Sequence, residues 1–358
     1  MMNKITSIRY NQIKRISPSQ FSAMKNCAYK LVLAEAFDKR YLLPLSPNAY
    51  LGTLFHKLLE QITRHQIKTE DELNQRFSAE LQTMEEKLIL EGNGFYTPLQ
   101  NNVKDFGIKK IQLKKYLLTL PTGTFVANKK YISEKWFQTT DGVLGGKIDL
   151  IIEDNDETEI IDFKTGSITM ESLDDDGEIV YHVKEEYQEQ IKLYAFLYSE
   201  STKRTSLKLN LVNLAKQKYS VDFTPEECSV LYQEARGLLD KINLTISELR
   251  FETIANPSAQ NCRFCLFRPA CSYYIEYLKI DKSFNDVTGV VTNTVTYMNG
   301  NISIDLDCNG EKITITGFGE EKSNYLNLCK GKTLNIFNLN KSMSGNIYTA
   351  TKTTIIYE

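Results

Sequence analysis

The chain has 358 residues, a length that suggests two domains or one large domain with an appendage. Apolar residues make up 42% and charged residues 25%, the composition of an ordinary globular protein with a substantial core. The net charge of −2 excludes a general basic field, so nucleic-acid binding would need local patches, and no apolar run approaches the roughly 18 residues that a membrane span needs.

Helical signals dominate the N-terminal part of the chain. A Ser-Pro pair that can cap a helix predicts a first helix over 17–37, which would carry Cys27. A second helix is predicted over 52–64. A third begins at Thr69, where Glu72 completes a capping box and apolar residues follow at intervals of three and four.

Strand-like segments come next and alternate with helices. A polar turn at 154–157 predicts that the segments on either side of it form an antiparallel hairpin. An acidic stretch, 171–178, is expected to be a solvated loop, and helices are expected over 186–199 and 226–249. The predicted strands are 124–138, 143–153, 158–164, 206–213 and 218–223. Together these segments predict an α/β fold.

The composition shifts after about residue 280, which divides the chain into predicted domains at 1–282 and 283–358. A helix-like piece at 320–330 follows the third of five strand-like segments. This is the order of an OB-type β-barrel, and an SH3-like barrel is the alternative. The five segments are 286–297, 301–307, 311–317, 332–338 and 346–357.

An OB-like domain could bind single-stranded DNA by stacking bases on aromatic side chains. The candidate stacking residues are Tyr297, Phe318, Tyr325, Phe337 and Tyr348. From residue 281 onward, however, there are eight acidic residues, seven lysines and no arginine, which is not the composition of a basic groove. A docking or dimerisation module is therefore an equal alternative.

Two carboxylates and a lysine are placed to converge on the predicted hairpin. Side chains alternate along a strand, so Asp149 faces away from its apolar neighbours, and Asp162 and Lys164 share one face. Two carboxylates can hold Mg²⁺, and a nearby ammonium can orient a water molecule and offset negative charge. A surface ion pair between Asp162 and Lys164 is the structural alternative.

The segments "GGKIDLII" and "EIIDFKTG" resemble the core of RecB-type PD-(D/E)xK nucleases. "GTLFHKLLE" resembles their upstream motif, which implies that His56 binds a metal ion together with Asp149 and Asp162. "YQEQIKLYAF" resembles their downstream motif, which implies that Gln190 and Tyr194 position the lysine or the DNA.

The resemblance implies a restriction-endonuclease-like α/β core with a helical N-terminal part, and Mg²⁺ or Mn²⁺ as the metal ion. Glu134, on the strand before the hairpin, is a candidate for a further acidic position of the family.

Three of the seven cysteines form a C-x₂-C-x₅-C string at Cys262, Cys265 and Cys271. The chain has no apolar secretory segment, so we expect a cytoplasmic protein with thiols or metal ligands in place of disulfides. Cys27 is the candidate for a fourth ligand. This arrangement resembles the iron–sulfur staple of CRISPR-associated RecB-like nucleases and of the AddB nuclease domain, which implies a structural [4Fe–4S] cluster. Zinc is the alternative metal.

These features predict a metal-dependent DNA nuclease, an exonuclease that acts on single strands or DNA ends. The alternative is a non-catalytic DNA-binding or assembly module of a repair or defence complex with zinc at the cysteines. A third hypothesis is a zinc-stabilised interaction protein. The chain lacks a P-loop, so a helicase or another defence subunit would be a separate partner. Cleavage polarity, exonuclease or endonuclease mode and oligomeric state stay open.

Overall fold

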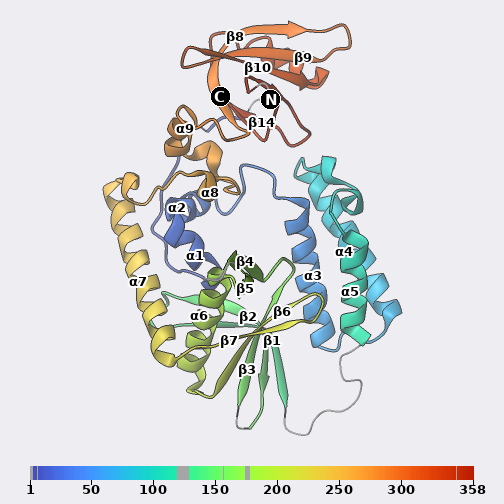
Figure 1. The fold of residues 1–358 in the computed structure, drawn as a ribbon, viewed down its shortest axis with the longest axis vertical. Coiled ribbons are helices and arrows are strands. Elements are labelled where there is room, and N and C mark those ends of the chain that lie inside the picture. Colours follow the sequence, from blue (N-terminus) through green and yellow to red (C-terminus); the bar gives the residue numbers. More distant parts are fainter. Residues whose placement is uncertain (1–2, 6, 119–128, 156, 174–177, 344) are drawn as a thin grey trace. The chain divides into compact units, whose positions relative to one another are not determined.

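The computed structural model describes residues 3–5, 7–118, 129–155, 157–173, 178–343 and 345–358 (Figure 1). The chain forms two compact units. The sheet unit comprises Ile13–Lys25 and Ser46–Leu244, and the terminal unit comprises Met1–Gln12, Asn26–Leu45 and Thr245–Glu358. Residue 283 lies inside the terminal unit, and the expected domain boundary at that residue stays a prediction. No helix of the described residues is long and apolar enough to cross a membrane.

A five-stranded sheet in the order β1-β2-β3-β6-β7 forms the centre of the sheet unit. Its strands are β1 (Lys130–Gln138), β2 (Gly145–Glu153), β3 (Thr158–Lys164), β6 (Leu207–Asn213) and β7 (Lys218–Val221). The predicted antiparallel hairpin is confirmed as β2 and β3. Strand β6 runs parallel to β3, and helix α6 (Glu185–Thr202) makes the crossover between them, as a parallel pair requires. Residues 124–128 of the first predicted strand lie outside the described residues.

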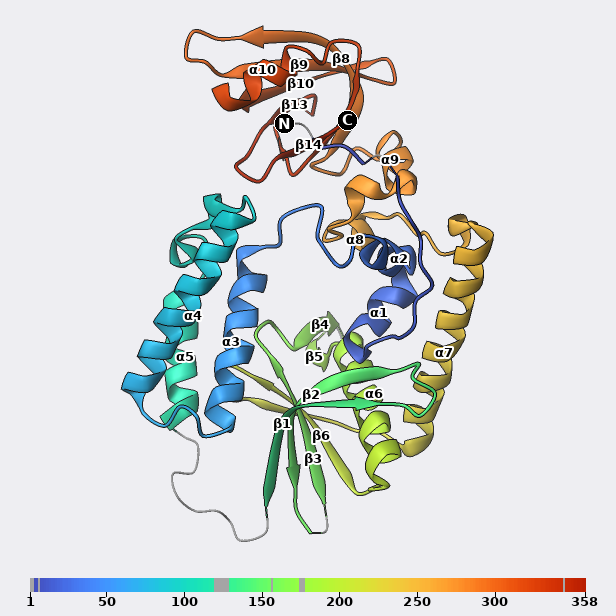
Figure 2. The ribbon, with the colours of Figure 1, turned by 180° about the vertical axis from the view of Figure 1, so that it is seen from behind.

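Helices cover the two faces of this sheet, as Figures 1 and 2 show from opposite sides. Helices α3 (Pro47–Thr63), α4 (Glu70–Leu90) and α5 (Phe106–Leu118) share one buried core with apolar residues of β2 and β3. The predicted capping box at Thr69 and Glu72 begins α4. Helices α6 and α7 (Pro225–Glu248) lie on the other side.

Two sequence-based expectations are corrected here. The first helix is divided into α1 (Pro18–Asn26) and α2 (Tyr29–Ala36), so Cys27 lies in the break between two helices. The acidic segment after β3 contains a two-stranded hairpin, β4 (Thr169–Leu173) and β5 (Ile179–Val183). Its strands flank residues 174–177, which are outside the described part of the chain. The segment 171–178 is rich in acidic residues, and this composition obscured the strand pattern on either side of it.

The terminal unit contains a seven-stranded sheet in the order β12-β13-β10-β9-β8-β11-β14. Its strands are β8 (Val287–Thr296), β9 (Ile302–Cys308), β10 (Glu311–Phe318), β11 (Thr333–Phe337), β12 (Asn340–Lys341), β13 (Ile347–Thr349) and β14 (Ile355–Tyr357). The last predicted strand is therefore interrupted, and a 3-10 turn (Glu320–Lys322) and the short helix α10 (Ser323–Leu326) follow β10. Among the aromatic residues expected to stack bases, Phe318, Phe337 and Tyr348 are buried, which excludes them from that role as the chain stands.

Close packing against β2 explains one glycine of its sequence. A Cβ atom on Gly146 would lie 2.9 Å from Cδ of Pro18 in α1 and 3.1 Å from Cε1 of Tyr194 in α6. Both distances are shorter than ordinary van der Waals contact, so any side chain here would push α1 or α6 away from the sheet.

We therefore expect Gly146→Ala to lower the free energy of unfolding of the sheet unit by about 1–3 kcal/mol, because overpacking forces neighbouring side chains to move. The matched control is Gly237→Ala in α7, where no atom lies within 4 Å of the added Cβ. The control should be neutral or more stable by up to ~1 kcal/mol, since alanine favours helix. Urea unfolding would measure both, and equal stability of the two variants would contradict the packing argument.

Candidate active site and cysteine pocket

The pairing between β2 and β3 ends where the polar cluster begins. The last paired residues, Leu150 and Ile161, point into the buried core. One position beyond them are Asp149 and Asp162, which therefore face the opposite side of the sheet. The amide of Phe163 donates a hydrogen bond to Oδ2 of Asp149 at 2.8 Å. A carboxylate thus takes a backbone donor at the point where the regular strand pairing stops.

Four predicted residues form one hydrogen-bonded cluster on that side. The Lys164 ammonium lies 2.7 Å from Oδ2 of Asp162 and donates to Oε1 of Gln190 at 2.7 Å. The amide nitrogen of Gln190 donates to Oδ1 of Asp162 at 3.1 Å and to the Tyr194 hydroxyl at 3.4 Å. The amide of Gln190 therefore holds both members of the Asp162–Lys164 pair, and this pair is not an exposed surface contact.

A third acidic residue stands in the same row across the sheet. The pairs on either side of it in β1 and β2 place Glu134 opposite Asp149, and its backbone has a positive φ of 52°. Burial and the charge of Glu60 raise the pKa of Glu134, while Lys147, 3.7 Å away, opposes that shift. The family position suggested for Glu134 therefore lies beside the cluster, although sequence alone gave it little support.

His56 approaches the cluster from α3. Its Nδ1 lies 3.7 Å from Oδ2 of Asp149. Burial lowers the pKa of His56, so its imidazole is neutral at neutral pH and can offer a nitrogen lone pair. The structure therefore places His56 beside Asp149, and its role as a metal ligand stays a prediction.

The charge balance of the cluster suits a divalent cation. Burial, followed by the nearby charge of Asp162, raises the pKa of Asp149 well above its ordinary value. Oδ2 of Asp162 is buried and accepts no hydrogen bond from the described residues, although the Lys164 ammonium is close. Carboxylate oxygens with an imidazole nitrogen are ligands that Mg²⁺ and Mn²⁺ accept. The donor set fits such an ion, with Asp149, Asp162 and His56 as its holders.

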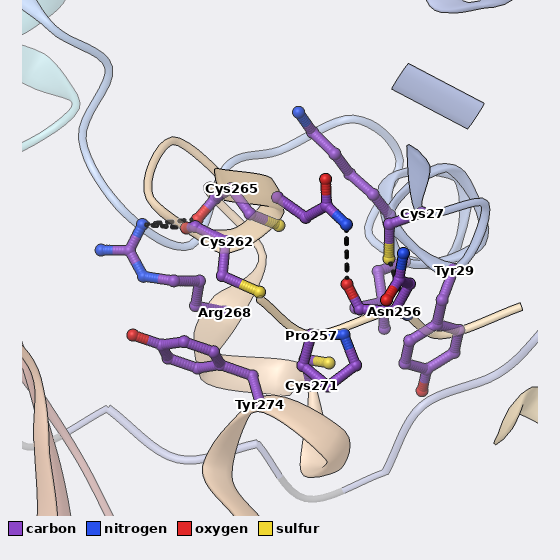
Figure 3. Close-up of a pocket in the computed structure, with 12 residues that line it drawn as sticks. Cys27, Tyr29, Asn256, Pro257, Cys262, Cys265, Arg268, Cys271 and Tyr274 are labelled. Atoms are coloured by element: carbon purple, nitrogen blue, oxygen red, sulfur yellow. Dashed lines mark hydrogen bonds between the residues drawn. The ribbon is translucent and has the colours of Figure 1, made fainter. Parts of the chain in front are cut away.

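The four predicted cysteines line one pocket of the terminal unit (Figure 3). Figure 3 shows the sulfur atoms of Cys27, Cys262, Cys265 and Cys271 facing the same space. Burial raises the pKa of Cys262 to about 11 and that of Cys271 to about 12. Without a bound cation these two thiols are therefore protonated at neutral pH.

The helix break at Cys27 has a local cause. The side-chain amides of Asn256 and Asn261 donate to the carbonyl of Asn26 at 3.0 and 3.1 Å. The backbone amide of Asn256 also donates to Sγ of Cys27 at 3.4 Å. The carbonyl at the end of α1 is satisfied by side chains, so the helix can stop there and turn the cysteine into the pocket.

Arg268 fixes the turn that carries the other cysteines. Its side chain is buried, and Nη1 donates to three backbone carbonyls of the turn. These belong to Cys262 at 3.2 Å, Arg263 at 3.1 Å and Cys265 at 2.9 Å. One guanidinium therefore holds the C-x₂-C segment in its curved form.

The same guanidinium is bound to the terminal β-sheet. Nε of Arg268 donates to Oδ2 of Asp286 at 2.7 Å, and Nη2 donates to Oδ1 of Asn338 at 3.1 Å. The Tyr274 hydroxyl also donates to Oδ2 of Asp286 at 2.7 Å. This buried network connects the cysteine turn with the strands that follow it in the chain.

Metal binding at either site would require the side chains to draw closer. Among the described residues, no group of three or more His, Cys, Asp or Glu side chains stands in an arrangement that could hold a metal ion. Four cysteines around one pocket are nevertheless the donor set of a structural zinc or iron–sulfur site, and Lys30 and Arg268 favour negative charge at Cys265.

Sequence reasoning missed two residues of these sites. The ring of Tyr187 faces the Lys164 ammonium at 4.3 Å. Its position three residues before Gln190 on a predicted helix was an available signal, because residues at that spacing share a face. Arg268 was visible among the cysteines, but its partner Asp286 lies in the predicted second domain, and no local pattern joins them.

Comparison with known proteins identifies the fold family of most of the chain. The family model for the "PD-(D/E)XK nuclease superfamily" matches residues 15–272. No curated protein matches. Among solved structures, that of a "Putative exonuclease" from Eubacterium rectale matches 70% of this chain and 87% of that chain, with 12% identity and a TM-score of 0.41. The matched span of the family model contains both the polar cluster and the four cysteines.

The raised pKa of Asp149 predicts a stability effect with a definite sign. The folded state binds this proton more tightly than the unfolded state, so the free energy of unfolding falls as the pH rises from the unfolded pKa through the folded pKa. Once the pH exceeds the folded pKa, the metal-free protein bears the full cost, about 1.4 kcal/mol for each pKa unit. Asp149→Asn should raise the free energy of unfolding of the metal-free protein at neutral pH. This difference from the parent should disappear in acid, where Asp149 is protonated in both states.

Thermal unfolding with and without Mn²⁺ would measure this effect, with the exposed Asp240→Asn in α7 as the control. Mn²⁺ should raise the unfolding temperature of the parent and of the control but leave Asp149→Asn unchanged. An Asp149→Asn protein that is less stable than the parent at neutral pH without metal would contradict the assignment.

Proposed function

The chain belongs to the PD-(D/E)XK nuclease superfamily, and from that membership we propose that it is a metal-dependent deoxyribonuclease. We propose further that it acts as an exonuclease on single-stranded DNA or on duplex ends. The observation that carries this proposal is the buried cluster in which Gln190 holds both Asp162 and Lys164. A structural role alone would not require two buried aspartates beside one another, with a lysine ion-paired to one of them.

Each side chain of the cluster has a distinct part in the proposed reaction. Asp149, Asp162 and His56 would hold Mg²⁺ or Mn²⁺, which would polarise the phosphodiester and favour attack by water. The Lys164 ammonium orients the attacking water and offsets charge that develops on the phosphate. Gln190 keeps Lys164 pointed at the site, and the Tyr194 hydroxyl hydrogen-bonds Gln190.

For the cysteine pocket we propose a structural [4Fe–4S] cluster, with Zn²⁺ as the alternative. The support is the convergence of four thiols in one pocket and the hydrogen-bonded turn around Arg268. The cluster would join the segment before α2 to the segment after α7, which are far apart in sequence. Because such sites couple metal binding to folding, we expect the iron–sulfur cluster to stabilise the terminal unit.

The strand pairings support an OB-like barrel in the terminal unit. Strand β8 pairs with β9 and β11, β9 pairs with β10, and β10 pairs in parallel with β13. Strand β14 pairs with β11 and is the last strand of the sheet on that side. If β13 and β14 are one interrupted fifth strand, five strands form a closed ring. Tyr297 is half exposed and is the candidate that can still stack a base.

A second function, a DNA-binding or assembly module that works with a helicase or another repair or defence subunit, is supported by charge. The chain has a net charge of −2, and its last segment has more acidic than basic residues. A protein without a basic field gains little from bulk attraction to DNA. Recruitment by a partner would compensate for this.

The first experiment is a nuclease assay on 5′- and 3′-labelled single-stranded and blunt duplex DNA with Mn²⁺. The parent should degrade DNA, and the labels would give the polarity. Asp162→Asn and Lys164→Met should each lower the rate about 100-fold or more, because each removes a group that stabilises the transition state. Asp240→Asn, an exposed substitution in α7, should cut like the parent.

If Asp162→Asn and Lys164→Met both cut DNA as fast as the parent, the active-site assignment is wrong. An inactive parent that still binds DNA would favour the assembly function.

The cysteine proposal predicts a different pattern. Anaerobically purified parent protein should absorb near 400 nm and contain iron, and Cys265→Ser should lose the metal and unfold at lower denaturant concentration. Cys228→Ser, a buried cysteine of α7 outside the pocket, is the control and should retain the metal. A well-folded, metal-loaded Cys265→Ser protein would contradict the proposal, and zinc without iron would select the alternative.

A further inference from the structure

One aromatic ring in the first turn of α6 faces two lysine ammonium groups. The ring centroid of Tyr187 lies 4.3 Å from Nζ of Lys164 and 5.5 Å from Nζ of Lys184. The two nitrogen atoms are therefore at most about 10 Å apart. One of these lysines belongs to the polar cluster. The other has no part in the roles assigned above.

Lys184 is poorly placed to stabilise the helix that it begins. It occupies the N-cap of α6, where its side chain caps no backbone amide. Its positive charge stands at the positive end of the helix dipole, an unfavourable position. Among the described residues, no carboxylate lies within ion-pairing distance of its ammonium. Its charge therefore serves neither the helix nor an internal ion pair.

The backbone around Lys184 is nevertheless firmly held. Its amide donates to the carbonyl of Ile168 at 3.0 Å, and its own carbonyl accepts the amide of Tyr187 at 3.0 Å. The side-chain amide of Gln188 donates to the neighbouring carbonyl of Val183 at 2.9 Å. These bonds fix the point from which the Lys184 side chain leaves the chain, at the base of the β4–β5 hairpin.

A ring partner differs from a carboxylate partner in a way that matters here. A carboxylate would neutralise the ammonium, whereas an aromatic face attracts it and leaves its charge and its N–H donors available. Lys164 also has Asp162 as a carboxylate partner, whereas the ring of Tyr187 is the partner of Lys184 and leaves its N–H donors available. An ammonium is a compact point charge that suits a phosphate oxygen.

We propose that Lys184 binds the phosphate next to the scissile one on the substrate strand, and that Tyr187 is the positioning residue that sets the spacing between this contact and Lys164. The proposal rests on the proposed nuclease function and assigns it a second phosphate contact. Successive charges along one DNA strand are close enough for two ammonium groups at this separation to meet neighbouring phosphates.

The test uses the full chain with Asp162→Asn, which should not cleave, and a fluorescein-labelled thymidine 20-mer. Removing one phosphate contact from a single strand lowers the slope of log K against log salt by about 0.7. Lys184→Ala should show this change and bind about 10-fold more weakly. Lys184→Arg should keep most of the slope. Lys241→Ala, which removes an exposed charge from α7, should leave both values unchanged.

Cleavage kinetics separate the roles of the two residues. In the otherwise native chain, Lys184→Ala should raise KM about 10-fold with kcat within 2-fold, since the contact is equal in ground and transition states. Tyr187→Leu should lower kcat as well, because Lys164 loses one of the three groups that hold it, and Tyr187→Phe should restore both constants. Failure of phenylalanine to rescue would overturn the positioning role of the ring.

The outcomes distinguish this inference from the function on which it rests. A parent protein that cuts DNA while Lys184→Ala matches it in slope and KM would overturn the phosphate contact and leave the nuclease assignment intact. A parent that binds the 20-mer with a Lys184-dependent slope but never cuts would overturn the nuclease assignment and support the contact.

Discussion

Three carboxylates in a row across β1, β2 and β3 are the constraint on which the sheet unit depends. Glu134, Asp149 and Asp162 lie on neighbouring strands, and burial makes their mutual repulsion costly. Lys147 and Lys164 supply opposite charge at two points of the row. The remaining imbalance falls on Asp149, whose pKa is raised. A divalent cation bound beside these carboxylates would offset their mutual repulsion.

Helix α6 supplies most of what keeps this row in place. It carries Gln190 and Tyr194, and its close approach to β2 is possible because Gly146 has no side chain. A partly buried ion pair between Glu189 of α6 and Lys25 at the end of α1 adds a second anchor. The helix that positions the lysine is therefore held on two sides, and a small displacement of it would reach the catalytic groups.

The terminal unit is built around an ion pair of a different kind. Arg268 and Asp286 are both buried, and each makes further hydrogen bonds that satisfy its remaining atoms. Removing one partner of such a pair usually costs about 3–5 kcal/mol, because the other charge stays buried. A chain cut at residue 283 would separate the two partners. The cysteine turn and the β-strands of this unit therefore depend on one another.

Local sequence determined most of the helices and strands of the sheet unit and the members of the polar cluster. Strand alternation placed Asp149, Asp162 and Lys164 on one face, and helical spacing placed Gln190 with Tyr194. Tertiary structure alone decided the break at Cys27, the pairing of Arg268 with Asp286, and the burial that raises the pKa of Asp149. These features depend on groups far apart in the chain. A periodic sequence pattern predicts which face of a helix or strand a side chain occupies, but not which residues it contacts.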